Sequence, residues 1–70
     1  MASEQAAASV KAARGDAIRA APGVFAISAQ RRAPNDFFLV VFVDRSSPLP
    51  EPQTIDGVDV IYRHADRLRP

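Results

Sequence analysis

The segment from Phe37 to Val43, FFLVVFV, restricts the possible folds of this chain more than any other feature. Its valine and phenylalanine content favours a β-strand over a helix. Successive side chains of a strand point to opposite faces, so this strand is apolar on both. Strands of that kind are typical of the centre of a sheet. The sequence therefore predicts a central strand over 37–44, and the fold has to cover both of its faces.

The segments around this strand predict one small α+β domain over residues 1–70. An Ala-rich helix is expected over 3–21, with Ser3 as its N-cap and Pro22-Gly23 as its end. Alternation of apolar and polar residues predicts two further strands. The expected elements are a helix over 3–21, strands over 24–31, 37–44 and 58–63, and a polar tail over 64–70.

The turn residues between these segments suggest how the strands are connected. Pro34 and Asn35 favour a tight turn, so the first two strands are expected to form an antiparallel hairpin. A loop with three prolines follows the second strand, and residues 54–57 read as a turn before the third. The predicted fold is one N-terminal helix packed on a three-stranded, mostly antiparallel sheet.

A single helix covers only one face of such a sheet, and this leaves apolar side chains on the other. Soluble proteins rarely expose a large apolar patch. One solution is a protein partner, most simply a second copy in a twofold dimer. The other is that the proline loop and the tail fold over the face, with Leu49, Ile55 and Leu68 as plugs. We favour the partner.

The candidate partner surface contains Val24 and Ala26, together with whichever side-chain set of the central strand faces away from the helix. We take that set to be Phe37, Leu39, Val41 and Val43.

Composition excludes several classes of protein. The chain has no cysteine, which excludes disulfides and cysteine-based zinc sites. Nine basic and eight acidic side chains give a net charge of +1, so no strong field attracts nucleic acid or an anionic membrane. The longest apolar run is too short to span a bilayer, and the first residues lack a secretion signal. We expect a cytoplasmic protein without a membrane partner.

The residues that could carry chemistry are few and scattered. His64 is the single histidine, and its neighbour Asp66 lies in a polar tail. A metal site or a general base needs several convergent groups. The carboxylates are dispersed, and three glycines form no phosphate-binding loop. We expect no enzyme activity, no cofactor and no catalytic or metal-binding residue.

The alternative function is nucleic-acid binding through two arginine clusters. The first contains Arg31, Arg32 and Arg45, and the second contains Arg63, Arg67 and Arg69. Nucleic-acid readers combine such clusters with exposed aromatic side chains. Here the aromatic residues lie in apolar strands and are expected in the core, and nearby aspartates balance the arginines. We therefore do not expect nucleic acid as the partner.

Three segments resemble a small bacterial domain that precedes trypsin-like protease domains in some proteins and also occurs alone. They are APGVFAI from Ala21, FLVVFVD from Phe38 and TIDGVDV from Thr54. The domain has a "PGV" entry into a glycine-rich strand, a "VVVYV" strand and an "IDGVPV" segment. This chain lacks the strand glycines and carries Ser28 and Gln30 there. The resemblance implies an accessory or interaction module and supplies no catalytic residue.

Overall fold

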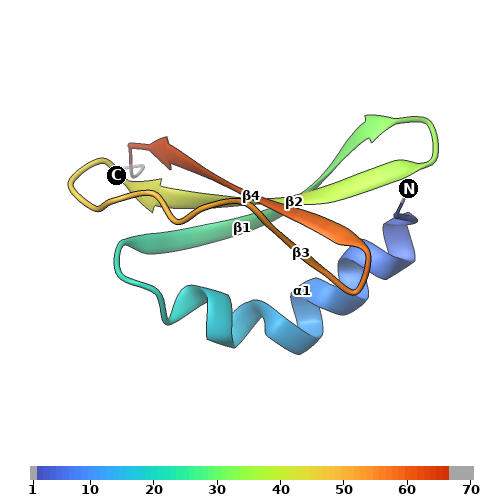
Figure 1. Cartoon of the computed structure of the whole chain (residues 1–70), viewed down its shortest axis with the longest axis horizontal. Helices are drawn as coiled ribbons and strands as arrows, with labels where there is room; N and C mark the ends of the chain where they lie inside the picture. The colour runs from blue at the N-terminus through green and yellow to red at the C-terminus, as the bar shows by residue number, and fades with distance from the viewer. Residues whose placement is uncertain (1, 67–70) are drawn as a thin grey trace, which may run out of the picture.

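The computed structural model describes residues 2–66, which form one helix and a four-stranded mixed sheet (Figure 1). The sheet order is β1-β2-β4-β3. The elements are α1 (Glu4–Arg19), β1 (Val24–Ala33), β2 (Asp36–Asp44), β3 (Gln53–Ile55) and β4 (Val58–Ala65). The α+β class, the N-terminal helix and the central position of β2 are as predicted.

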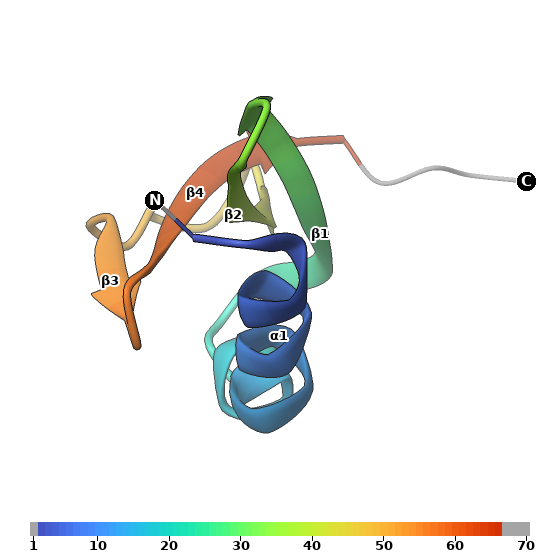
Figure 2. The ribbon, with the colours of Figure 1, turned by 90° about the vertical axis from the view of Figure 1, so that its right-hand side faces the viewer.

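Helix α1 lies on one face of the sheet, which arches over it (Figure 2). The side chain of Ser3 caps the helix by accepting a hydrogen bond from the Ala6 amide at 3.1 Å. The helix is continuous through Gly15 and ends at Arg19, two residues before the predicted end. It buries Val10 and Ile18 and contacts mainly β1, then β2 and β4. The helix therefore covers the β1 side of the sheet more fully than the β3 side.

The turn from α1 into β1 depends on glycine. Gly23 has φ of +81°, and a Cβ atom there would overlap the side chain of Ser47. Its carbonyl accepts a hydrogen bond from the Asp44 amide at 2.8 Å. This contact fixes the start of β1 against the end of β2. The two strands then pair antiparallel, as predicted for the hairpin.

The prediction of three strands is wrong, because residues 53–55 form the short edge strand β3. Asp56 and Gly57 both have positive φ, at 51° and 81°, and they form the two-residue turn between β3 and β4. This backbone matches the twist of a hairpin, so Gln53–Ile55 pairs with β4. The last strand also runs farther than predicted, since His64 and Ala65 belong to β4 rather than to a tail.

Strand β4 lies between β2 and β3 and is parallel to β2. The loop over 45–52 and the strand β3 together form the connection that this parallel pair requires. As a result, β2 is hydrogen-bonded on both sides.

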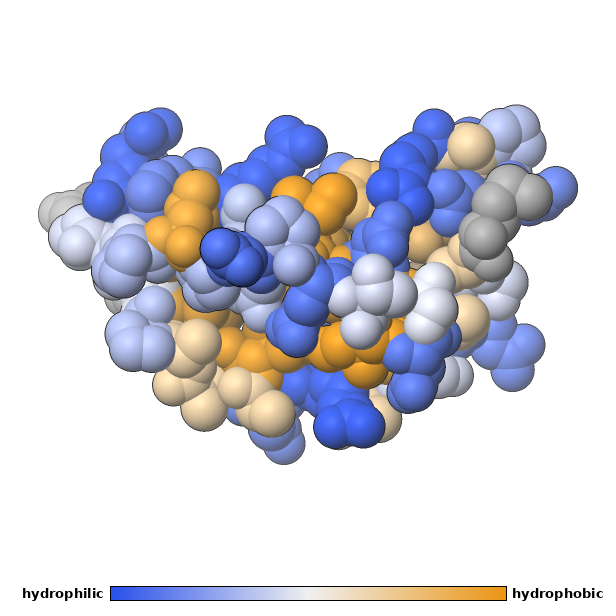
Figure 3. Space-filling view, viewed as in Figure 1, coloured by the Kyte–Doolittle hydropathy of each residue, from blue (hydrophilic) through white to orange (hydrophobic). Residues whose placement is uncertain are grey.

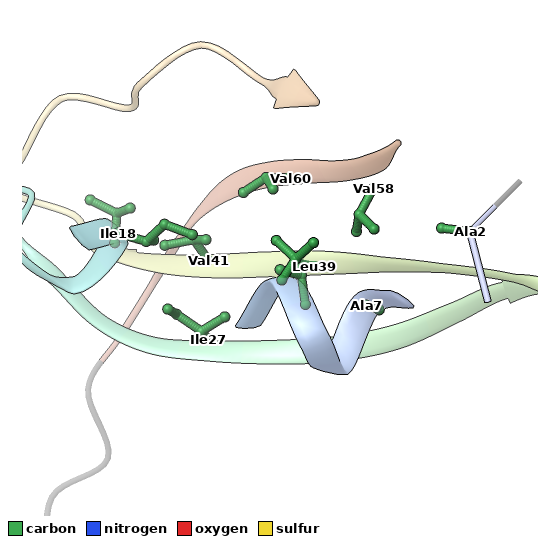
Figure 4. Close-up of a cluster of buried hydrophobic side chains, with 10 residues drawn as sticks. Ala2, Ala7, Ile18, Ile27, Leu39, Val41, Val58 and Val60 are labelled. Atoms are coloured by element: carbon green, nitrogen blue, oxygen red, sulfur yellow. The ribbon is translucent and has the colours of Figure 1, made fainter. Parts of the chain in front are cut away.

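The core lies between α1 and the concave face of the sheet (Figure 4). Side chains from β1, β2 and β4 meet those of the helix there. Its buried members are Ala2, Ala7, Val10, Ile18, Ile27, Leu39, Val41, Val43, Val58 and Val60. In β4 the apolar residues alternate, and Val58, Val60 and Tyr62 share the face that meets the helix.

Two leucines provide a matched test of this core. Leu39 is 0% exposed in the core, whereas Leu49 is 45% exposed in the loop. Leu39→Ala should reduce the free energy of unfolding by about 2–5 kcal/mol, because it removes buried methyl groups and leaves a cavity. Leu49→Ala should change it by less than about 0.5 kcal/mol. Urea denaturation measures both, and equal effects would contradict the assigned packing.

Candidate interaction surfaces

The predicted partner surface lies mostly on the face that the helix covers. Leu39, Val41 and Val43 are 0% exposed within the core, and Phe37 and Val24 pack against them. In this fold Leu39, Val41 and Val43 are not available to a partner, whereas Phe37 and Val24 are half-buried. Ala26 is different, because it pairs with Phe42 and faces away from the helix. The periodicity of β2 separates its two side-chain sets correctly, but it does not reveal which set meets the helix.

The outer face of the sheet carries the other side-chain set of β2. Phe38 and Val40 are 8% and 2% exposed, and Phe42 is half-buried. Val40 is flanked in the register by Ser28 of β1 and Ile61 of β4. Within residues 2–66, no helix or second sheet covers this face (Figure 2). The exposed apolar part is centred on Phe42, Ile61 and Ala26, which are all half-buried.

The residues considered as plugs for this face do not serve that purpose in the described chain. Leu49 lies in the loop and is the one large apolar residue in the exposed class within residues 2–66, at 45%. Ile55 packs against the core on the helix side. Leu68 lies outside the described residues. The outer face thus receives no apolar cover from Leu49 or Ile55.

Arg32 connects the strands across one end of the outer face. Its Nε donates to Asp36 Oδ2 at 2.8 Å, and its terminal nitrogen donates to Asp59 Oδ2 at 2.7 Å. Thr54 Oγ1 donates to the other oxygen of Asp59 at 3.1 Å. The guanidinium also lies 5.1 Å from the centre of the Phe38 ring, within cation–π range. One network therefore joins β1, β2, β4 and β3.

The network affects the titration of its members. The Arg32 hydrogen bond, with the Ala2 amide as a second donor, lowers the pKa of Asp36 below its ordinary value of 3.8. The Arg32 and Thr54 hydrogen bonds lower the pKa of Asp59 in the same way. The two carboxylates in turn raise the pKa of Arg32. All three groups are held in their charged forms.

The arginine clusters do not form a free basic patch in the described chain. Arg32 is engaged with two carboxylates, and Arg45 Nε pairs with Asp66 Oδ1 at 2.7 Å. Arg31 and Arg63 are exposed, on β1 and β4. Arg67 and Arg69 lie outside the described residues. Two of the six predicted nucleic-acid residues thus have acidic partners.

The two edges of the sheet differ strongly. β3 has three residues and follows Pro48, Pro50 and Pro52, so it offers little backbone for pairing. β1 has ten residues and pairs only with β2 among the described strands. Sequence analysis did not identify β1 as an edge, because strand order depends on which strand returns beside β2. The available signal that the other edge is short was segment 53–55, which has only three residues and follows three prolines.

A second apolar surface lies between α1 and β3. In Figure 3 a band of apolar side chains separates the helix from the strand above it. Ala17, Ile18 and Ala21 of the helix segment line one wall, and Ile55 and Tyr62 line the other. Gln53 bridges to the Tyr62 hydroxyl at 2.9 Å. This shallow groove marks the part of the concave face that the helix leaves uncovered.

The titratable groups of residues 2–66 form no cluster of three or more metal-ligating side chains. His64 lies on β4 and donates through Nε2 to the Ser47 carbonyl at 2.7 Å, which joins the strand to the loop. In the same part of the chain, no helix is long and apolar enough to cross a bilayer.

Comparison of the chain with protein-family models, curated proteins and solved structures gives no match.

The Arg32 network makes a prediction about pH. In the folded state Asp36 and Asp59 have lowered pKa values, so their contribution to stability is present above about pH 4 and is lost as pH falls through those values. Arg32→Gln should raise both pKa values toward 3.8. The free energy of unfolding should then fall less when the pH is lowered. NMR titration of the carboxyl carbons measures the shifts.

Arg45→Gln is the matched control, because Arg45 and Asp66 are 66% and 80% exposed and their pair contributes little. It should leave the pKa values of Asp36 and Asp59 unchanged. If Arg32→Gln also left them unchanged, the network would not hold these carboxylates in their charged forms.

Proposed function

We propose that this protein is a non-enzymatic interaction module that associates with protein through the uncovered part of its sheet, in the simplest case with a second copy of itself. The observation that supports the proposal is that, in residues 2–66, one face and one long edge of the sheet are uncovered. Its outer face has no second layer, and its longest edge has no neighbouring strand. Association would cover apolar side chains and pair backbone groups that otherwise face solvent.

The outer face has a composition suited to protein contact. Its centre is apolar and half-exposed at Phe42 and Ile61, and its margin carries the charged Arg32 network and Arg63. An apolar centre with a polar rim is the common pattern of protein interfaces. Because the Arg32 network already joins four strands, the rim is ordered before a partner binds, which reduces the entropy lost on binding.

The resemblance to the small bacterial domain noted above supports the same class of function. That domain stands alone or beside a protease domain, so the resemblance implies an accessory role without catalysis. Cytoplasmic localisation and a non-enzymatic role are parts of this proposal.

Self-association can be tested by light scattering at a low and a high protein concentration, each in low and high salt. We expect twice the 7.6 kDa chain mass at the high concentration in both salts, because apolar burial and backbone pairing depend weakly on ionic strength. A monomer under all four conditions would exclude the self-associating form of the proposal.

Nucleic-acid binding would give a different result. A labelled random oligonucleotide should show no anisotropy change with this protein at low salt, since Arg32 and Arg45 are paired with aspartates. Phosphate contacts would instead produce binding that weakens steeply as salt is added. That outcome would favour the arginine clusters over the sheet as the functional surface.

A further inference from the structure

The middle of the free edge of β1 lacks the features that normally prevent strands from pairing between molecules. Edge strands are usually short, or carry lysine, proline or bulges along their length. In β1 the register is irregular only near Phe25 and Arg32, which leaves a regular stretch over residues 26–31. Its first five residues, AISAQ, are uncharged and contain no proline. On the side away from β2, alternate residues of this stretch direct backbone N–H and C=O groups outward.

The side of the helix beside this edge carries opposite charges at its two ends, so it can pair with the same side of a second helix that runs antiparallel. A groove between α1 and β1 is lined by Ala29 of β1 and by one side of the helix. That side has the small residues Ala8 and Ala12, and the charged residues Lys11 and Asp16 lie beside them. Glu4 and Arg19, the first and last residues of α1, lie on the same side. If two such helices lie antiparallel, Glu4 of each faces Arg19 of the other.

We propose that β1 pairs antiparallel with β1 of a second copy, forming a continuous eight-stranded sheet with the two α1 helices side by side on one face. This inference rests on the proposed self-association and names its surface. The twofold axis passes beside Ala29, within the regular stretch of β1, so that Ala29 meets Ala29 of the second copy and both helices lie on one face. Like positions of antiparallel strands meet at such an axis, so Arg31 of one copy lies away from Arg31 of the other.

The helix geometry agrees with this axis. Ala29 shares its groove with Lys11 and Ala12, which are the two middle residues of α1. The groove extends along the helix from Glu4 to Arg19, so a twofold axis beside Ala29 is compatible with one that passes the middle of the helix. Ala8 and Ala12 allow two helices to approach closely, and the two Glu4–Arg19 pairs favour the antiparallel arrangement against the repulsion of the two Lys11 side chains near the axis.

A lysine at the centre of the edge provides the first test. Ala29 is exposed, so Ala29→Lys should fold normally but add two more ammonium groups to the two of Lys11 near the axis. We expect the dimer dissociation constant, measured by sedimentation equilibrium, to rise at least about tenfold. Gln53→Lys introduces the same side chain at the exposed β3 edge and should leave it unchanged. Circular dichroism checks that both variants are folded.

A charge exchange on the helix tests the predicted facing residues. Glu4→Arg and Arg19→Glu should each weaken the dimer by about tenfold at low salt, since each replaces two attractive pairs with two repulsive ones. The double variant should recover most of the wild-type dissociation constant. Glu51→Arg, in the exposed loop, is the control for the change in net charge and should have no effect.

Amide hydrogen exchange gives a readout specific to strand pairing. Above the dissociation constant, the outward-facing amides within residues 26–31 should exchange slowly, and dilution should remove that protection. A wild-type dimer that survives Ala29→Lys but is lost with Phe42→Lys would place the contact on the outer face, which overturns the β1 pairing and leaves self-association intact. A wild-type monomer at every concentration overturns both.

Discussion

The hydrogen bonding of β2 on both sides is the constraint on which the other contacts depend. Its neighbours are β1 on one side and β4 on the other, and its apolar side chains fill both faces. One set, with Leu39, Val41 and Val43, meets the helix. The other set fills the outer face beside Ile61 and Ser28. A shift of one residue in the register would exchange the two sets, so the close fit of the core side fixes the register for both.

Arg32 and Asp36 hold the ends of the strands in that register. Asp36 accepts hydrogen bonds from Arg32 and from the Ala2 amide, and the Phe37 amide donates to the Ala2 carbonyl at 2.7 Å. The start of the chain is thereby attached to the start of β2. At the opposite end, the Gly23 and Asp44 backbone groups and the His64 contact to Ser47 do the same. Polar contacts at both ends thus frame an apolar centre.

The sequence predicted the α+β class, the helix and the hairpin because each rests on local signals, such as the Ser3 cap and the alternation in β1. It did not predict β3, since Gln53–Ile55 is too short to show alternation and its strand character comes from pairing with β4. The Asp56-Gly57 pair was the local sign of a two-residue hairpin. Leu39, Val41 and Val43 of the candidate surface lie in the core for a related reason. Periodicity defines two faces of β2, whereas only the path of the chain decides which one α1 covers.

The parallel position of β4 has a consequence for how the chain reaches its native state. β4 supplies Val58 and Val60 to the core and separates β2 from β3, so the hairpin of β1 and β2 cannot complete its second edge until residues 58–65 arrive. Contacts between segments distant in sequence slow folding, because the intervening chain must be ordered first. During that interval β2, the most apolar segment of the protein, exposes an unpaired edge. An unpaired edge of β2 makes an incompletely folded chain prone to pair with other molecules, and the arrival of β4 beside β2 removes that edge.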